Sequence, residues 1–255
     1  MSGEKDAAMD PMRRGLVLGS GLLLLAPCRA WSQGALDREH APRLEMPILA
    51  EDAAAVPLQV SVEHPMEADH FIRSLEVSLD KDPVPWKGKF LFTPGNGRAW
   101  AAFTMRSGSG GLVRATAECS RHGKFTATRE VRVAEGGCAT TAPVDRSRLG
   151  NPQLRLPGSL RPGQVVEVKT KVDHDSQTGL ALKGGKYVRE GPEFFIKEML
   201  VYLDAEKISE FQMGSAISAN PLIRFPLKIT RSGTVRVVFV NSEGQRWEAS
   251  QPVRV

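Results

Sequence analysis

The chain has 255 residues, and 34 Lys and Arg against 29 Asp and Glu give it a formal net charge of +5. This length suits two compact domains of about 100 residues each, and the aromatic content of 6% supports two modest cores rather than one large one. Basic residues are interleaved with acidic ones, and no basic run is flanked by aromatic residues. That pattern argues against nucleic-acid binding.

The N-terminal segment indicates export. Arg13 and Arg14 precede an apolar stretch that ends at Ala26, and small residues follow it. This pattern predicts a signal peptide over residues 1–35, which is too short to span a membrane. The arginine pair favours a twin-arginine signal, with an ordinary secretory signal as the alternative. We therefore expect a periplasmic protein with no membrane attachment after cleavage.

Short alternating runs rich in Val, Leu and Phe follow, separated by Gly, Pro, Asn and Asp, and no segment has helical spacing of apolar residues. They predict strands at 56–63, 74–80, 88–93, 100–106, 111–120 and 125–133 in the first half. In the second half they predict strands at 153–156, 165–172, 196–203, 206–211, 222–229, 233–241 and 246–255. Short strands with regular turns are typical of antiparallel sandwiches.

The two halves repeat each other. Residues 105–108 are echoed by 230–233, residues 111–114 by 233–236, and each half closes on Val-Arg-Val. We therefore expect an all-β protein of two immunoglobulin-like antiparallel sandwiches, over 41–133 and 153–255, which could pack as a pseudo-dimer. Residues 134–152 have the composition of a flexible linker.

Two cysteines remain after the expected signal cleavage, and their settings differ. Cys119 shares a strand face with Val113, Ala115 and Ala117, so strand alternation places it in the core as a small hydrophobic residue. Cys138 lies in the linker, past the last strand of the first half. A disulfide between the two is one reading for an exported protein, and an incidental linker cysteine is another.

Cys138 is the leading candidate functional residue. Gly136 and Gly137 precede it and supply backbone freedom, and small residues follow it. Nothing in the neighbouring sequence would bury it, so we expect an exposed thiol on a short arm, hinged at the two glycines. Such a thiol is available as a nucleophile or for conjugation.

Metal-binding patterns are weaker. His64, Met66 and His70 lie close together, and His with Met would suit copper in an exported sandwich. His122 is a turn residue, and no Cys–His spacing fits zinc. We expect no metal and no resident cofactor, with a copper-binding sandwich as an alternative.

Two sets of motifs carry a resemblance to a known family. The first contains residues 56–62, His64-Pro65-Met66, residues 92–99 and Gly136-Gly137-Cys138. The second contains residues 163–169, Phe195-Ile196, residues 215–221 and Ser232-Gly233-Thr234. On the first set, residues 41–139 resemble SoxY, the thiol carrier of the periplasmic thiosulfate-oxidising system. On the second, residues 151–255 resemble its partner subunit SoxZ. The chain therefore looks like a natural SoxY–SoxZ fusion.

The resemblance implies a carrier rather than an enzyme, with Cys138 as the covalent attachment site of sulfur intermediates. A c-type cytochrome of the SoxAX type would load thiosulfate, and a hydrolase of the SoxB type would release sulfate. A sulfane dehydrogenase of the SoxCD type would oxidise the sulfur left behind. A structural or adhesive double sandwich, with Cys138 only in a disulfide, is the alternative.

The sequence departs from the family in two places. The family arm is a free C-terminus, whereas Cys138 is followed by a whole second domain, so the arm would enter a partner as a loop or only after the linker is cut. The second half has His174-Asp175-Ser176-Gln177 where the family usually has His-Pro-Met-Glu.

Overall fold

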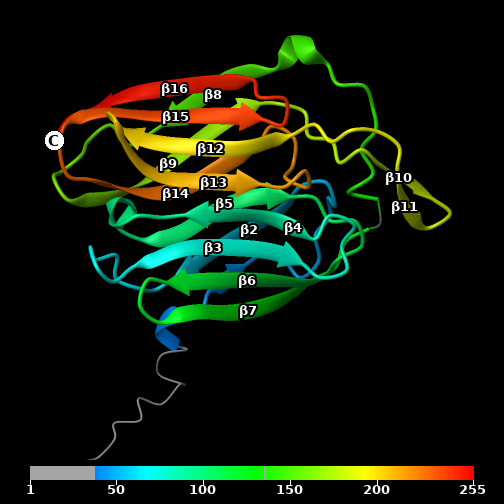
Figure 1. Ribbon diagram of the computed structural model, residues 1–255, viewed down its shortest axis with the longest axis horizontal. Coiled ribbons are helices and arrows are strands. Elements are labelled where there is room, and N and C mark those ends of the chain that lie inside the picture. Colours follow the sequence, from blue (N-terminus) through cyan, green and yellow to red (C-terminus); the bar gives the residue numbers. More distant parts are fainter. Residues whose placement is uncertain (1–37, 135) are drawn as a thin grey trace, which may run out of the picture. The chain divides into compact units, whose positions relative to one another are not determined.

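A computed structural model describes residues 38–134 and 136–255 (Figure 1). The expected signal peptide over 1–35 lies outside the described residues. All elements below belong to the compact unit Ser32–Val255. No helix among the described residues is long and apolar enough to cross a membrane.

Two large antiparallel sheets make up most of the part of the chain that the structure describes (Figure 1). The larger sheet contains β3 (Ile72–Leu79), β4 (Trp86–Leu91), β6 (Gly111–Cys119), β7 (Gly123–Val131), β12 (Ile196–Leu203), β13 (Glu206–Met213), β15 (Gly233–Asn241) and β16 (Arg246–Val253). The smaller sheet contains β1 (Arg43–Glu45), β2 (Val56–Val62), β5 (Ala99–Met105), β8 (Gly150–Arg155), β9 (Gln164–Asp173) and β14 (Leu222–Ile229). A separate hairpin, β10 (Leu180–Lys183) and β11 (Lys186–Arg189), stands away from both sheets (Figure 1).

The strand order is symmetric about the junction of the two halves. The larger sheet runs β16-β15-β12-β13-β4-β3-β6-β7, and the smaller one runs β1-β2-β5-β14-β9-β8. The halves meet where equivalent strands pair antiparallel, β4 with β13 and β5 with β14. The expected internal repeat is thus a pseudo-two-fold arrangement in which both sandwiches share their sheets.

The core is continuous across this junction. One hydrophobic cluster contains buried side chains from both halves. At the β4–β13 pairing, Phe90 lies opposite Phe211, and their rings stack. Strand alternation positions the core residues as expected, since Val113, Ala115, Ala117 and Cys119 of β6 are all buried. Burial of apolar surface at the junction makes the two halves one folding unit.

The expected fold class is confirmed as an all-β, two-sandwich arrangement. All thirteen predicted strands are present, and the ranges 222–229 and 233–241 match β14 and β15. The short strand β1 and the hairpin β10–β11 were not predicted. Within the linker, residues Arg146–Arg148 form a 3-10 turn, and β8 begins at Gly150.

Candidate functional site

The segment that carries Cys138 is docked against both halves of the protein. The Gly136 amide donates to the Gly108 carbonyl at 3.1 Å, and the Thr178 hydroxyl donates to the Cys138 carbonyl at 2.5 Å. Ala139 then forms a parallel bridge with Leu180 at the start of the β10–β11 hairpin. The first half therefore supplies one wall of the site, and the second half supplies the other.

Both glycines before Cys138 are required by this docked geometry. Gly136 has a φ of 99°, in the region that residues with a Cβ rarely adopt. At Gly137 the φ is ordinary, but a Cβ would lie 2.2 Å from the Ser107 carbonyl oxygen and 2.3 Å from that of Ala53. Gly136 therefore permits the left-handed backbone conformation and Gly137 permits close approach of the backbone, roles that the sequence did not indicate.

The Cys138 thiol is fully buried and contacts a charged pair. Its Sγ donates to Asp82 Oδ1 at 3.4 Å, and Lys87 Nζ donates to the same oxygen at 2.8 Å. Both side chains of the Asp82–Lys87 pair are 0% exposed. Asp82 also accepts from the Gly108 amide at 2.6 Å, and Lys87 donates to the Arg106 carbonyl at 2.9 Å. The charges are thus paired and hydrogen-bonded, as buried charges must be.

Burial raises the pKa of the Cys138 thiol to about 12, with Lys87 opposing the shift and Asp82 adding to it. A thiol with this pKa is neutral near pH 7, and the thiolate is the nucleophilic form. The expectation of an exposed, reactive thiol was wrong for this conformation. The segment is docked with its thiol against Asp82 of the first half and its backbone against Thr178 and Leu180 of the second half, which sequence reasoning treated as a separate domain.

Arg106 adds a second positive charge beside the site. Its Nη1 donates to the Gly137 carbonyl at 3.4 Å and its Nη2 to the Ser176 carbonyl at 3.2 Å. Among the described residues its Nε has no hydrogen-bond partner. Burial lowers the pKa of Arg106, which the potential negative charge of Cys138 opposes. Two cations and one carboxylate thus surround the thiol.

Cys119 and Cys138 are both free and buried. Cys138 Sγ contacts Asp82, whereas Cys119 Sγ contacts the imidazoles of His64 and His122. The reading in which these two cysteines form a disulfide is therefore contradicted.

The surroundings of Cys119 contain a second group of chemically active side chains. His40, which precedes β1, joins His64 and His70 from the β2–β3 connection and His122 from the β6–β7 turn. We call these four histidines and Cys119 the histidine–cysteine cluster. Burial lowers the pKa of His64, and its imidazole neighbours lower it further against the hydrogen bond to Pro65. Burial, followed by His122 and Arg121, also lowers the pKa of His70.

Sequence reasoning found only part of this cluster. It singled out His64 and His70, which do come together, but grouped them with Met66, which instead packs partly buried against the core. It treated Cys119 as core filler and His122 as a turn residue. Cys119 and His122 are three positions apart across a tight turn, a spacing that could have signalled shared ligation. The contribution of His40 depends on tertiary structure.

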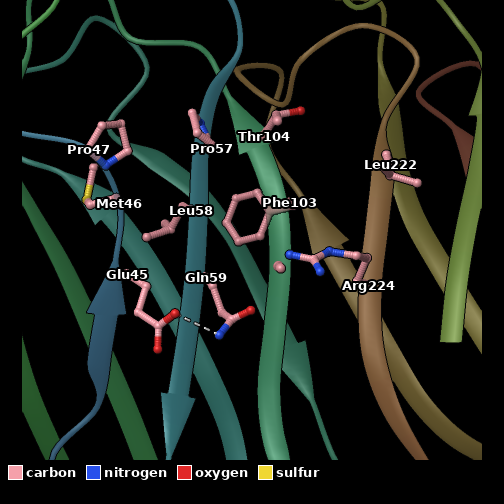
Figure 2. Close-up of a pocket in the computed structure, with 11 residues that line it drawn as sticks. Glu45, Met46, Pro47, Pro57, Leu58, Gln59, Phe103, Thr104, Leu222 and Arg224 are labelled. Carbon is pink, nitrogen blue, oxygen red and sulfur yellow. Dashed lines mark hydrogen bonds between the residues drawn. The ribbon is translucent and has the colours of Figure 1, made fainter. Parts of the chain in front are cut away.

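A surface pocket of about 480 Å³ lies elsewhere, over β1, β2, β5 and β14 (Figure 2). Figure 2 shows Phe103 and Leu58 at its centre, with Gln59 hydrogen-bonded to Glu45 on one side and Arg224 on the other. Its lining residues include no thiol and no histidine. The pocket therefore lacks a thiol for covalent carriage of sulfur.

Comparison with known proteins gives two family matches. Sulfur oxidation protein SoxY matches residues 30–138, and sulphur oxidation protein SoxZ matches residues 154–252. No curated protein matches the chain. Solved structures similar to part of it include the superoxide reductase (neelaredoxin) from Ignicoccus hospitalis, at 30% identity over 37% of this chain and 81% of that one, with a TM-score of 0.35. The superoxide reductase (neelaredoxin) from Archaeoglobus fulgidus is 22% identical over 37% of this chain and 90% of its own, with a TM-score of 0.31.

Proposed function

Because the chain belongs to the SoxY and SoxZ families, joined in tandem on one polypeptide, we propose that it is the sulfur carrier of the Sox pathway and that Cys138 is its attachment point. The observation that carries this proposal is that Cys138 ends the SoxY-matching segment and docks against the SoxZ-matching half. On this proposal the chain is acted on by partner enzymes and works in the periplasm.

The chemistry at Cys138 is formation and cleavage of bonds to sulfur. Joining the Cys138 sulfur to thiosulfate releases the thiol proton and two electrons, and a c-type cytochrome of the SoxAX type accepts the electrons. A hydrolase of the SoxB type then adds water across the S–SO₃ bond, which releases sulfate and leaves a persulfide on Cys138. A sulfane dehydrogenase of the SoxCD type is a further candidate partner.

The docked conformation is the resting state of this carrier. In it the thiol is buried and its pKa is raised to about 12, so little thiolate forms. Loading therefore requires residues 136–139 to undock from the two halves, which breaks the contacts with Thr178, Leu180 and Arg106. The released segment reaches a partner as a loop, because the chain continues into the second half. This arrangement protects the thiol between encounters with partner enzymes.

The charges around the docked thiol also suit the loaded state. A thiosulfate adduct carries a negative charge, and Lys87 and Arg106 are two cations beside the Cys138 position. The Arg106 Nε, which lacks a partner among the described residues, is a donor that such an adduct can use. Buried charges need partners, so an anionic adduct would be held better here than in an apolar slot.

Thiosulfate-dependent cytochrome c reduction tests the proposal. Periplasmic extract from a strain that lacks this chain is supplemented with purified wild-type protein, with Cys138→Ser, or with Cys119→Ser. We expect wild type to restore the reaction and Cys138→Ser to leave it at background while remaining folded by circular dichroism. Restoration by Cys138→Ser would overturn the proposal.

A further inference from the structure

The nitrogen atoms of the histidine–cysteine cluster form a closed four-membered ring of contacts. His64 Nε2 is 3.1 Å from His40 Nε2 and 3.1 Å from His70 Nε2. His122 Nδ1 closes the ring, at 3.2 Å from His70 Nε2 and 3.0 Å from His40 Nε2. The cluster lies in the first half, at the end of β6, and includes the buried His40 and the exposed His122.

Hydrogen bonds between the imidazoles account well for at most two of the four contacts in this ring. His64 Nδ1 is 2.5 Å from the Pro65 carbonyl oxygen, which can only accept, so Nδ1 carries the proton. In the neutral imidazole, Nε2 then presents a lone pair to the cluster. Any N–H at another corner can point well at only one of its two neighbours. A cation at the centre would instead satisfy the four nitrogen atoms together.

The ring has the dimensions of a metal site. For a square with sides of this length, the centre is about 2.2 Å from each corner, close to the metal–nitrogen distance for histidine. Cys119 Sγ is 3.8 Å from His64 Nε2 and 3.7 Å from His122 Nδ1, which are opposite corners. Nearly equal distances from opposite corners place the sulfur close to the plane midway between them. The five donors therefore consist of four nitrogen atoms in a closed ring and one sulfur atom within 4 Å of two of its corners.

Contacts outside the ring hold the donors in place. The Pro65 carbonyl orients the His64 ring, and the Arg121 amide donates to Cys119 Sγ at 3.5 Å. The Arg121 guanidinium donates to the Asp69 carbonyl at 3.1 Å, which ties the segment bearing His70 to the turn bearing His122. Supporting bonds of this kind orient metal ligands and tune their basicity.

The second half provides an internal comparison. By the repeat, His174 follows β9 as His64 follows β2, and Asn241 ends β15 as Cys119 ends β6. There the amide of Asn241 lies 3.3 Å from His174 Nε2, a pairing that a hydrogen bond satisfies. Gly244 occupies the position of His122 in that turn. The second half thus has a hydrogen-bonded pair at this place in the fold, without equivalents of the Cys119 thiol and the His122 imidazole.

We propose that the histidine–cysteine cluster binds one first-row transition-metal ion through four imidazole nitrogens and the Cys119 thiolate. Magnesium and calcium are excluded by the donor types, because both prefer oxygen ligands. Zinc favours four tetrahedral ligands, so this arrangement suits it less. Iron(II), nickel(II) and copper(II) accept imidazole ligands, and five donors exceed the four of a tetrahedral zinc site. This site is separate from the Cys138 thiol and goes beyond the carrier function.

Cobalt(II) is a suitable probe, because thiolate ligation to it gives a charge-transfer absorption band. The full chain is stripped with a chelator and titrated anaerobically with cobalt(II), while metal per chain is measured by mass spectrometry. We expect one equivalent to bind and the thiolate band to appear. Cys119→Ser should abolish the band, and His70→Ala should weaken affinity by at least about tenfold. Cys138→Ser is the matched control and should bind as wild type does.

His122→Gly keeps the test decisive if Cys119→Ser fails to fold. It copies the turn of the second half and changes an exposed side chain, so the fold should survive, and we expect cobalt(II) affinity to fall by at least about tenfold. Absence of stoichiometric binding by wild type would overturn the proposal. So would a band that persists in Cys119→Ser and disappears in Cys138→Ser.

Discussion

Cys138 and Cys119 are both buried, but different groups face their sulfur atoms. Cys138 faces the Asp82 carboxylate, which is paired with Lys87, and burial raises the pKa of the thiol more than Lys87 lowers it. Cys119 faces two imidazoles and a backbone amide. The first setting suits a thiol that reacts only after release, and the second suits a permanent ligand.

A substitution at Gly137 tests whether the segment that carries Cys138 is docked. In Gly137→Ala the new Cβ would clash with two carbonyl oxygens, so the segment cannot dock and the thiol should become accessible. We expect alkylation of Cys138, followed by peptide mass mapping at pH 7.5, to speed up by at least about tenfold. Gly158→Ala is the control, because open space surrounds that residue. Equal rates in wild type and Gly137→Ala would contradict the buried resting state.

The raised pKa of Cys138 predicts a pH dependence of stability. The thiol is an acid whose pKa rises from 9.0 in the unfolded chain to about 12 in the folded one. The contribution of the thiol to the free energy of unfolding is therefore complete below pH 9. It is lost as the pH rises toward 12, because the thiol of the unfolded chain releases its proton first. In urea unfolding, the free energy of unfolding of wild type should fall by up to about 4 kcal/mol relative to that of Cys138→Ala across this pH range. A difference in unfolding free energy between the two proteins that stays constant from pH 8 to 11 would contradict the raised pKa of Cys138.

At the scale of elements, alternation and turn residues carry most of the information about the large sheets. The β10–β11 hairpin was missed because its strands have four residues each and only Leu180 is buried, so they lack a clear apolar face. This hairpin nevertheless covers the site, since the Tyr187 hydroxyl donates to the Gly108 carbonyl and accepts from the Gly136 amide. Some of the contacts that hold the Cys138 segment in place thus come from the least predictable element.

Tyr187→Phe tests the role of the hairpin. Removing the hydroxyl deletes the 2.7 Å bond to Gly108 and the 3.0 Å contact with Gly136, so the docked segment should open more often. A lost hydrogen bond of this kind is worth about 1 kcal/mol, which corresponds to a roughly fivefold rise in the alkylation rate of Cys138. Tyr202→Phe, on β12, serves as the control. No change in Tyr187→Phe would show that the hairpin does not retain the thiol.

At the scale of the whole molecule, the internal repeat could be recognised in the sequence, but the way in which the two halves pair could not be predicted from it. Matches such as residues 111–114 with 233–236 indicate two similar sandwiches. They do not indicate that β4 would pair with β13, because edge pairing leaves no separate pattern in either strand. The convergence of His40 with Cys119 is likewise tertiary, which explains why the histidine–cysteine cluster was found only in part.

The shared sheets predict that the halves stay together without the linker. A protease site inserted between Pro143 and Val144 allows the purified chain to be cut in solution. Because the core and both sheets cross the junction, we expect the fragments to co-elute at micromolar concentration and to melt in one transition. Separation of folded fragments on a sizing column would show that the junction is weaker than the shared core implies.

The central claim is that Cys138 carries sulfur covalently, and the mass of its peptide tests this most directly. Protein is isolated from the periplasm of cells growing on thiosulfate and is analysed before and after mild reduction. We predict a reducible adduct of thiosulfate or persulfide mass on the Cys138 peptide, with none on Cys119. A Cys138 peptide that is unmodified in all the material, or that carries a disulfide to Cys119, would contradict the account.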